Sequence, residues 1–282
     1  MRKDAAWWEA QYGNRAAVPE HPQIFARWAR DSGRARKALR AWLDVPYGDH
    51  PLEKLDLFPA RGESRALLAF IHGGYWRSLD KADFAFLAPA LVERGVTVAI
   101  VNYALCPAVA IEDIVRQQLQ ACAWLWRNGR HFGAPSGSLY LAGHSAGGQL
   151  VAMMMAAVWP LFKPDLPRKV VSGGLAVSGL YDLEDLVNVP SLNADLRLDP
   201  AAARKVSPIH YDPATDAPLY LAVGGKELPP FIEQNRAFAR HWKKVLAADI
   251  PCPEDNHFTI LDRLTEPSSA LFTGAMKMMG LA

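Results

Sequence analysis

From residue 55 onward, the amino-acid sequence alternates short apolar runs with amphipathic stretches. Apolar runs of four to six residues without a polar face are typical of strands buried on both sides. The predicted strands are 66–71, 96–101, 138–142, 175–178 and 219–223. Apolar residues at helical spacing predict helices over 83–94, 111–129, 147–157, 231–246 and 267–279. Pro89 must kink the first of these helices or lie in its first turn.

The first 45 residues follow a different pattern. Between residues 23 and 43, apolar side chains recur at helical spacing with arginines between them: Ile24, Phe25, Trp28, Ala35, Leu39 and Trp42. This pattern predicts one or two amphipathic helices that lie on the main body of the protein. We therefore expect an N-terminal helical segment over 1–45, packed on a main domain over 46–282.

Alternating buried strands and amphipathic helices indicate an α/β fold, with a mostly parallel central sheet and helices on both faces. In such sheets, ligands bind at the carboxyl ends of the strands. Each candidate motif described below directly follows a predicted strand. We therefore expect these motifs to meet at one edge of the sheet.

The segment Gly143-His144-Ser145-Ala146-Gly147 follows the strand 138–142 and precedes a helix. A G-x-S-x-G motif in this context forms a sharp strand-to-helix turn that exposes the serine hydroxyl above the sheet. The strained turn leaves no room for side chains at the flanking glycines. Ser145 is therefore the predicted nucleophile, while we expect His144 to be a packed neighbour of the turn. The alternative is a glycine-rich turn with an idle serine.

The segment His72-Gly-Gly-Tyr-Trp76 follows the strand 66–71. Acyl transfer places negative charge on the substrate oxygen, and preorganised backbone N–H groups stabilise that charge. We assign these donors to Gly74, Tyr75 and Ala146, the last being the residue after the nucleophile. Gly73 mainly shapes the loop, and we expect His72 to hydrogen-bond within it. The alternative is a plain turn at the end of a strand.

These two motifs, H-G-G-Y-W over 72–76 and G-H-S-A-G-G over 143–148, resemble the kynurenine formamidase (arylformamidase) group. That group lies within the HGG-type esterase/lipase branch of the α/β-hydrolase superfamily. The resemblance begins near Tyr47 and includes residues 55–58, 178–182 and 256–258. It implies a serine hydrolase, and Trp76 favours the formamidase-like group over general esterases.

α/β-hydrolases place the catalytic acid and then the histidine after the serine along the chain. In this superfamily the acid commonly ends a G-x-x-D turn, and residues 224–227 match that turn with glutamate in place of aspartate. A carboxylate there holds the histidine in the right tautomer. Glu227 is the predicted acid, with Asp182 and Asp255 as alternatives.

His257 is the predicted general base, because it lies late in the chain, in a loop before an apolar helical pattern. The competing reading is a surface loop histidine. The other histidines weighed for this role either precede the serine or lie in or before predicted helices or turns: His21, His50, His72, His210 and His241.

Composition narrows the function further. The formal net charge is only +2, which argues against the basic surface of a nucleic-acid-binding protein. Residues 1–45 carry nine Lys or Arg against five Asp or Glu, which is typical of a solvated helix face. No apolar stretch is long enough to span a membrane, and the N-terminus lacks an apolar signal core. We expect a cytoplasmic protein that binds neither nucleic acid nor membrane.

The sequence predicts neither a metal nor a cofactor. Cys106, Cys122 and Cys252 are odd in number and widely spaced, which supports no redox or zinc motif and fits a reducing cytoplasm. H-E-x-x-H metal motifs and G-x-x-x-x-G-K phosphate-binding loops are also missing from the sequence.

The expected activity is therefore hydrolysis of a small-molecule acyl amide or ester. An arylformamidase acting on N-formyl aryl amines is the first hypothesis, and a short-chain carboxylesterase is the second. A catalytically silent binding protein is a third, which the intact Ser145 argues against. We expect the N-terminal helical segment to pack near the mouth of the active site, and Gly73 and Trp76 to border the substrate. Trp7, Trp8, Tyr75 and Trp76 either line an aromatic pocket or, as is more common for aromatic residues in such helices, belong to the core. The sequence is compatible with a homodimer and does not fix the oligomeric state.

Overall fold

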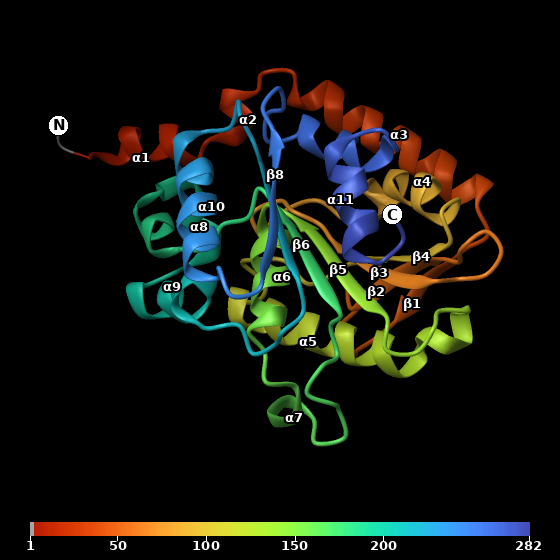
Figure 1. Ribbon diagram of the computed structural model, residues 1–282. Helices are drawn as coiled ribbons and strands as arrows, with labels where there is room; N and C mark the ends of the chain where they lie inside the picture. Colours follow the sequence, from red (N-terminus) through yellow and green to blue (C-terminus); the bar gives the residue numbers. More distant parts are fainter. Residues whose placement is uncertain (1–2) are drawn as a thin grey trace.

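The computed structural model describes residues 3–282, and its centre is an eight-stranded sheet in the order β1-β2-β4-β3-β5-β6-β7-β8 (Figure 1). β2 pairs antiparallel with β1 and with β4, and all other neighbours are parallel. The strands are β1 (Trp42–Pro46), β2 (Lys54–Phe58), β3 (Ala66–Ile71), β4 (Val96–Val101), β5 (Leu139–His144), β6 (Gly173–Val177), β7 (Leu219–Gly224) and β8 (Leu246–Cys252).

Helices cover both faces of this sheet and bury a separate apolar core on each (Figure 1). One core involves α5, α6, α8 and α10, and the other involves α3, α4 and α11. Leu67 and Leu68, neighbours in β3, belong to opposite cores because successive side chains of a strand point to opposite faces. The helices are α1 (Ala5–Tyr12), α2 (Asn14–Ala17), α3 (His21–Ala38), α4 (Ala88–Val92), α5 (Ile111–Asn128), α6 (Ala146–Met155), α7 (Trp159–Phe162), α8 (Pro190–Leu196), α9 (Pro200–Lys205), α10 (Pro229–His241) and α11 (Ala270–Met278).

The predicted fold class and all five predicted strands are confirmed, but three strands were not predicted. β1 and β2 precede the first predicted strand, and β8 includes the last residue of the helix predicted over 231–246. α10 ends at His241, and β8 is an edge strand with several exposed positions, so its apolar residues give no continuous run. Pro89 lies in the first turn of α4, which is one of the two positions that the sequence analysis allows for it.

The N-terminal helices α1, α2 and α3 form what we call the N-terminal cover. α3 ends at Ala38, where Leu39 adopts an extended backbone, so Trp42 lies in β1 and not in a helix as predicted. Trp28 of α3 is buried and packs on Phe84 and Phe86, with ring centroids 5.7 and 5.6 Å away. The division of the chain at residue 45 stays a prediction.

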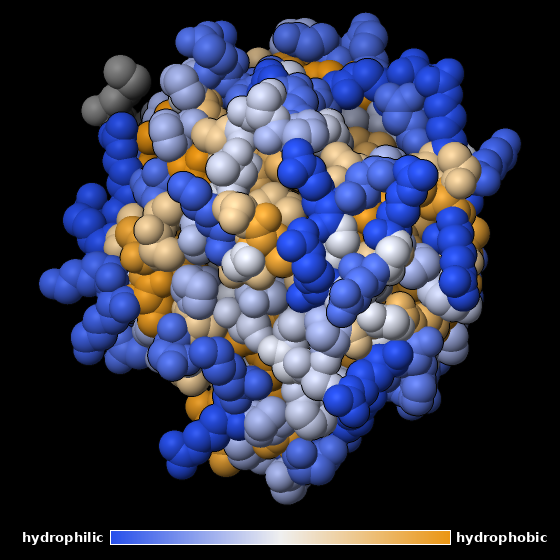
Figure 2. Space-filling view, turned by 45° about the vertical axis from the view of Figure 1, so that its right-hand side comes forward, coloured by the Kyte–Doolittle hydropathy of each residue, from blue (hydrophilic) through white to orange (hydrophobic). Residues whose placement is uncertain are grey.

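Figure 2 shows one face on which charged and polar side chains predominate and apolar ones form small, separated patches. Within residues 3–282, no helix combines the length and the apolar character that crossing a membrane requires.

The parallel strands place their carboxyl ends at one edge of the sheet, here called the carboxyl edge. The chain moves from β3 outward to β4 and then returns to β5 on the other side of β3. In doubly wound sheets, such a switch point opens a crevice for ligands. The predicted site residues follow the ends of β3, β5, β7 and β8 and meet there.

Candidate active site

Ser145 occupies a strained turn between β5 and α6. Its φ and ψ are 57° and −117°, a combination that side-chain-bearing residues rarely adopt. A Cβ on Gly147 would lie 1.9 Å from the carbonyl oxygen of Ile71, so only glycine lets α6 pack this closely on β3. The Ser145 N–H donates to the carbonyl of Val177 at 2.8 Å. The turn is therefore fixed by sterics and by hydrogen bonding to the neighbouring strand.

His257 lies between Ser145 and Glu227. Its Nε2 is 3.0 Å from Ser145 Oγ, and its Nδ1 is 2.6 Å from Glu227 Oε2. All three residues are buried. The carboxylate requires a donor at Nδ1, so Nε2 is left to accept the serine hydroxyl proton. The second carboxylate oxygen accepts the Gly224 N–H at 2.7 Å and the Ser178 hydroxyl at 2.5 Å.

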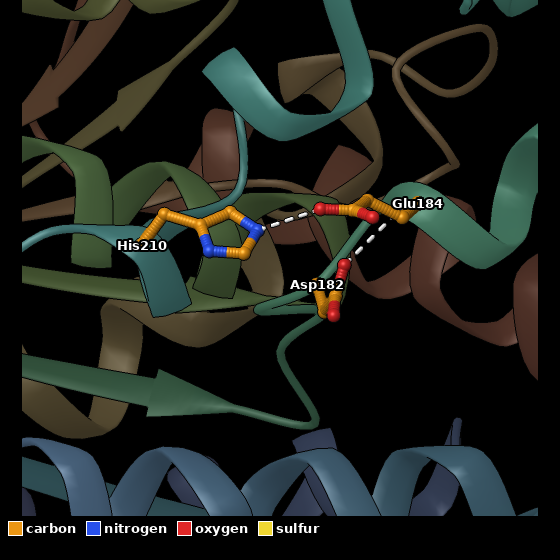
Figure 3. Close-up of side chains that lie close together, drawn as sticks. All are labelled: Asp182, Glu184 and His210. Carbon is orange, nitrogen blue, oxygen red and sulfur yellow. Dashed lines mark hydrogen bonds and ion pairs between the residues drawn. The ribbon is translucent and has the colours of Figure 1, made fainter. Parts of the chain in front are cut away.

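The alternative acid Asp182 does not reach His257. It lies in a cluster with Glu184 and His210, and one of its carboxylate oxygens accepts the Glu184 N–H at 3.0 Å (Figure 3). Glu184 also contacts His210 at 2.9 Å and Arg204 at 3.1 Å. These three residues have side chains that can bind a metal ion, but Glu184 already pairs with Arg204.

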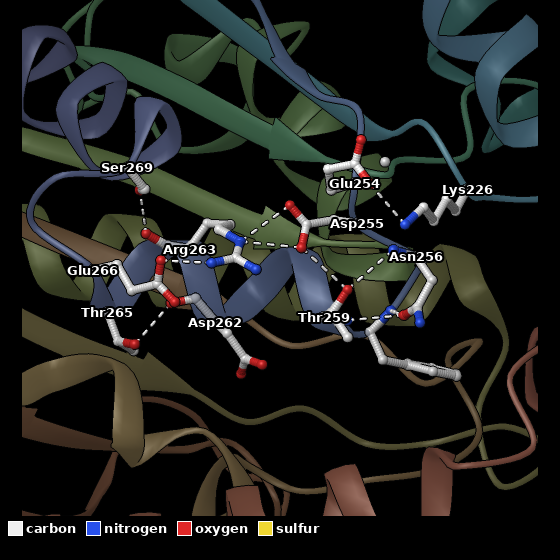
Figure 4. A network of polar contacts seen from close by, with 12 residues as sticks. Lys226, Glu254, Asp255, Asn256, Thr259, Asp262, Arg263, Thr265, Glu266 and Ser269 are labelled. Carbon is white, nitrogen blue, oxygen red and sulfur yellow. Dashed lines mark hydrogen bonds and ion pairs between the residues drawn. The ribbon is translucent and has the colours of Figure 1, made fainter.

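The other alternative acid, Asp255, supports the loop that carries His257. It pairs with Arg263 at 3.1 Å and accepts the Thr259 hydroxyl at 3.2 Å (Figure 4). The adjacent Asn256 side chain accepts the N–H groups of Phe258 and Thr259. This network occupies the carboxylate of Asp255 and holds the loop in place.

His144 braces the same loop from β5. Its Nε2 lies 2.7 Å from the His257 carbonyl oxygen. Burial, aided by the neighbouring His257, holds the pKa of His144 well below its usual range. The ring is therefore neutral and donates its Nε2–H to that carbonyl. His144 is a packed neighbour of the turn, as the sequence predicts.

The loop after β3 passes directly against the serine. Gly74 has a φ of 114°, and a Cβ there would lie 2.1 Å from the Ser78 carbonyl oxygen. A Cβ on Gly73 would lie 3.1 Å from that of Ser145. Within residues 3–282, the N–H groups of Gly74, Tyr75 and Ala146 donate no hydrogen bond. Three unpaired amides thus lie on the loop and the turn beside the Ser145 hydroxyl.

His72 anchors the start of this loop. Its ring stacks between Phe84 and Tyr103, with centroids 5.5 and 4.3 Å away. Its Nδ1 is 2.8 Å from the Gly73 carbonyl oxygen, and its Nε2 is 3.1 Å from Asn102 Oδ1. Burial lowers the pKa of His72. The contact with Gly73 is the hydrogen bond within the loop that the sequence analysis expects.

The comparison with known proteins agrees with this geometry. A sequence profile described as the alpha/beta hydrolase fold matches residues 68–248. The chain belongs to the α/β-hydrolase family. It is 30% identical to the kynurenine formamidase of Danio rerio, over 88% of this chain and 85% of that protein. This α/β hydrolase is therefore an enzyme, similar in sequence to formamidases.

Two solved structures show the same fold. A protein of Silicibacter sp. TM1040, described as a candidate thioesterase, is 32% identical, with a TM-score of 0.84 over 97% of this chain and 98% of that chain. The esterase of Pyrobaculum calidifontis is 17% identical, with a TM-score of 0.73 over 94% of each chain. The second likeness concerns the fold of the α/β hydrolase alone.

A cavity of about 240 Å³ opens beside Ser145 and His257. The N-terminal cover and the loop after β3 form much of its wall. Lining side chains that matter below are Glu9, Arg15, Phe25, Trp28, Tyr75, Arg77, Ser78 and Phe258. The hydrolase therefore encloses its serine in a small, mostly apolar pocket with charged groups in the wall.

The expectation that Trp76 and Gly73 border the substrate is wrong. Trp76 is 0% exposed and donates its Nε1–H to Gln149 of α6 at 3.1 Å, so its ring belongs to the core. Gly73 lies against His144 and Ser145 and does not line the cavity. Of the predicted aromatic pocket only Tyr75 lines the cavity, while Trp7 and Trp8 contact each other in α1.

The N-terminal cover lies at the active-site cavity, as the sequence predicts, but the contacts that join it to the site were not predicted. The Tyr75 hydroxyl donates to the Tyr12 carbonyl at 2.8 Å, and Asn14 Nδ2 donates to the Tyr75 hydroxyl at 3.4 Å. The Tyr12 hydroxyl in turn donates to Asp185 at 2.9 Å. Ser178, the partner of Glu227, was also missed. Two sequence signals pointed to it: Ser178 is the last residue of the predicted strand 175–178, and it begins the segment 178–182 of the family resemblance.

Proposed function

We propose that this hydrolase is an arylformamidase that uses Ser145 as nucleophile, His257 as general base and Glu227 as the orienting acid. The observation that carries the proposal is the continuous hydrogen-bonded chain from Glu227 through His257 to Ser145 at the wall of the cavity. Such a chain lets a serine hydroxyl lose its proton as it attacks a carbonyl carbon.

In the first half-reaction, His257 Nε2 takes the proton of Ser145 Oγ while that oxygen bonds to the acyl carbon. The carbonyl oxygen becomes an oxyanion, which the N–H groups of Gly74, Tyr75 and Ala146 stabilise. Glu227 stabilises the imidazolium that forms. The intermediate then expels the amine, which receives the proton from His257, and leaves an acyl-serine.

In the second half-reaction, water attacks the acyl-serine. His257 takes a proton from the water and returns it to Ser145 Oγ as the ester bond breaks. The products are the free carboxylic acid, formate when the acyl group is formyl, and the original enzyme. Over the whole cycle the serine–histidine pair gives one proton to the amine and regains one from water, so its protonation state is restored.

The similarity to the Danio rerio kynurenine formamidase supports a formyl amide of an aryl amine as the substrate. The cavity also supports a compact acyl group, because Tyr75 stands next to the proposed oxyanion donors and its hydroxyl is fixed by Tyr12. Phe25, Trp28 and Phe258 provide an apolar wall for an aryl leaving group.

A substrate panel tests this proposal. We expect N-formylkynurenine to be hydrolysed, and aryl acetate to react faster than butyrate and octanoate. Because one excess methylene in a tight pocket reduces kcat/KM by about tenfold or more, the fall along the series should be steep. Equal or rising rates with chain length and no formamide turnover would leave a carboxylesterase. An acetyl thioester in the same panel tests for thioesterase activity.

Fluorophosphonate labelling addresses the third hypothesis, a catalytically silent binding protein. We expect one label per chain on Ser145, and a lack of labelling would favour the binding protein. Location in the cytoplasm stays a proposal, supported by three buried cysteines with free thiols. Size-exclusion chromatography decides between a monomer and a homodimer.

A further inference from the structure

Two guanidinium groups face the active-site cavity from different parts of the chain. Arg15 comes from α2 in the N-terminal cover, and Arg77 comes from the loop after β3. Partial burial, and then the positive charge of Arg77, lower the pKa of Arg15. Two like charges at one cavity favour an anion between or beside them.

In the described part of the chain, only one of these arginines has a carboxylate partner. Arg77 Nη1 donates to Asp195 at 2.6 Å and to the Ser191 carbonyl at 2.7 Å. Arg15 Nη2 donates to the neutral hydroxyl of Ser78 at 3.1 Å, and its guanidinium lies 5.6 Å from the Phe25 ring centre. Within residues 3–282, Arg15 makes no ion pair.

The acidic residue of the cavity wall does not neutralise Arg15 either. Both carboxylate oxygens of Glu9 accept hydrogen bonds from Ser191, one from its N–H and one from its hydroxyl, each at 2.6 Å. Glu9 is therefore directed toward the start of α8. Arg15 is therefore a cation of the cavity wall without an anionic partner among residues 3–282.

Two linked hydrogen bonds connect Arg15 to the loop that carries the proposed oxyanion donors. Ser78, which accepts from Arg15, donates its hydroxyl to the Gly74 carbonyl at 3.0 Å. Arg15 is thus two hydrogen bonds away from Gly74, which carries one of the proposed oxyanion donors. A planar guanidinium fork matches a carboxylate, which can accept two parallel hydrogen bonds.

We propose that Arg15, with Arg77 beside it, binds a carboxylate carried by the leaving group of the substrate, and so selects acidic aryl amides and esters. The inference rests on the proposed function for the position of the acyl group at Ser145. The N-terminal cover is then a specificity element, because it brings the unpaired cation to the cavity.

The test uses matched pairs of substrates that differ in one carboxylate. The amide pair is N-formylkynurenine and its decarboxylated analogue, and the ester pair is 3-acetoxybenzoate and phenyl acetate. The readout is the ratio of kcat/KM for the acidic substrate to that for its partner. Comparing this ratio between variants cancels the electronic effect of the carboxylate on the leaving group.

For Arg15→Met, which keeps an unbranched apolar stem and removes the charge, we expect the ratio to fall about tenfold, mainly through KM. Arg15→Lys should recover part of the ratio, because a point charge remains without the planar fork. Arg34→Met is the matched control, since Arg34 is exposed on α3 and pairs with Asp31. It should leave the ratio unchanged.

A ratio that stays the same in Arg15→Met, or that falls equally in Arg34→Met, would overturn the assignment. The two proposals fail in different ways. If the wild-type enzyme hydrolyses neither amide but cleaves both esters, the formamidase proposal fails, and the ester pair still decides the role of Arg15. If Arg15→Met lowers kcat/KM by the same factor for both members of a pair, Arg15 only shapes the cavity wall. That result would contradict carboxylate binding.

Discussion

The carboxyl edge of the sheet and the N-terminal cover meet at one cavity, but different kinds of contact hold them. At the edge, Ser145 is 2% exposed, and a Cβ on Gly147 would lie 1.9 Å from the Ile71 carbonyl oxygen. The cover is joined beside the cavity by side-chain hydrogen bonds such as Tyr12 to Asp185 and Glu9 to Ser191. Its Arg15 remains in contact with solvent.

This difference separates reaction chemistry from substrate selection. Close-packed backbone leaves almost no freedom at the carboxyl edge, so the distances among Ser145, His257 and Glu227 are tightly held. Polar side chains on the surface of a helix can change with little loss of stability. We therefore expect substitutions at the edge to abolish turnover and substitutions in the cover to alter which substrates react.

The largest expected effect is that of Ser145→Ala. Removing the proposed nucleophile should lower kcat by about a millionfold, the loss typical of a serine hydrolase. Residual catalysis of about a thousandfold over water can persist from the oxyanion donors and binding. Fluorophosphonate labelling and kcat are measured, with circular dichroism as the check on folding. Ser172→Ala is the control, and full labelling of Ser145→Ala would contradict the mechanism.

Next in size is the effect of Glu227→Gln. The amide cannot hold the imidazole in the required tautomer, so kcat should fall by about ten-thousandfold. Asp182→Asn and Asp255→Asn should cost far less, because neither side chain contacts His257. Steady-state kinetics of the three purified variants gives the order. A larger loss in folded Asp182→Asn than in Glu227→Gln would assign the acid to the loop after β6.

Low pH should reduce the free energy of unfolding through two buried histidines at the carboxyl edge. His72 and His144 have pKa values below their usual range because they are buried. The unfolded chain therefore binds more protons than the folded chain at pH values below about 6.5, and stability falls as pH falls. Each histidine can contribute up to about 1.4 kcal/mol per pH unit in that range.

Urea unfolding at pH 7.5, 6.0 and 5.0 measures this dependence. We expect His144→Gln to reduce the slope of the unfolding free energy with pH, although the variant is less stable at pH 7.5. His131→Gln, which changes an exposed histidine, should keep the wild-type slope. A slope that is identical in all three proteins would contradict a neutral, buried His144.

The smallest expected effect is that of Tyr12→Phe, which removes only the hydroxyl that donates to Asp185. One such hydrogen bond contributes about 1 kcal/mol, so α1 and α2 should open more often by a factor of about five. Limited proteolysis near residues 5–17 should be faster, and KM should rise more than kcat falls. Unchanged proteolysis together with a large fall in kcat would show that the cover also supports the chemistry.

The sequence by itself determined the nucleophile turn, the loop after β3 and the five central strands. These features are local: a buried strand, a glycine that permits a close approach and a following helix lie within about a dozen residues, and sterics act at that range. The same local reasoning missed β1, β2 and β8, which lie at or near the two ends of the sheet. Partly exposed positions interrupt the apolar runs of β1 and β8, which are the edge strands.

Only the tertiary structure decided which groups face one another. Glu227, Asp182 and Asp255 all follow strands at the same edge, and the contact with His257 selects Glu227. Trp76 adjoins the proposed oxyanion donors in sequence, yet packing against Gln149 draws it into the core. Contacts between the cover and the site link residues far apart in the chain, such as Tyr12 and Asp185, 173 positions apart. Such contacts depend on how separately folded elements pack, and no short stretch of sequence carries that information.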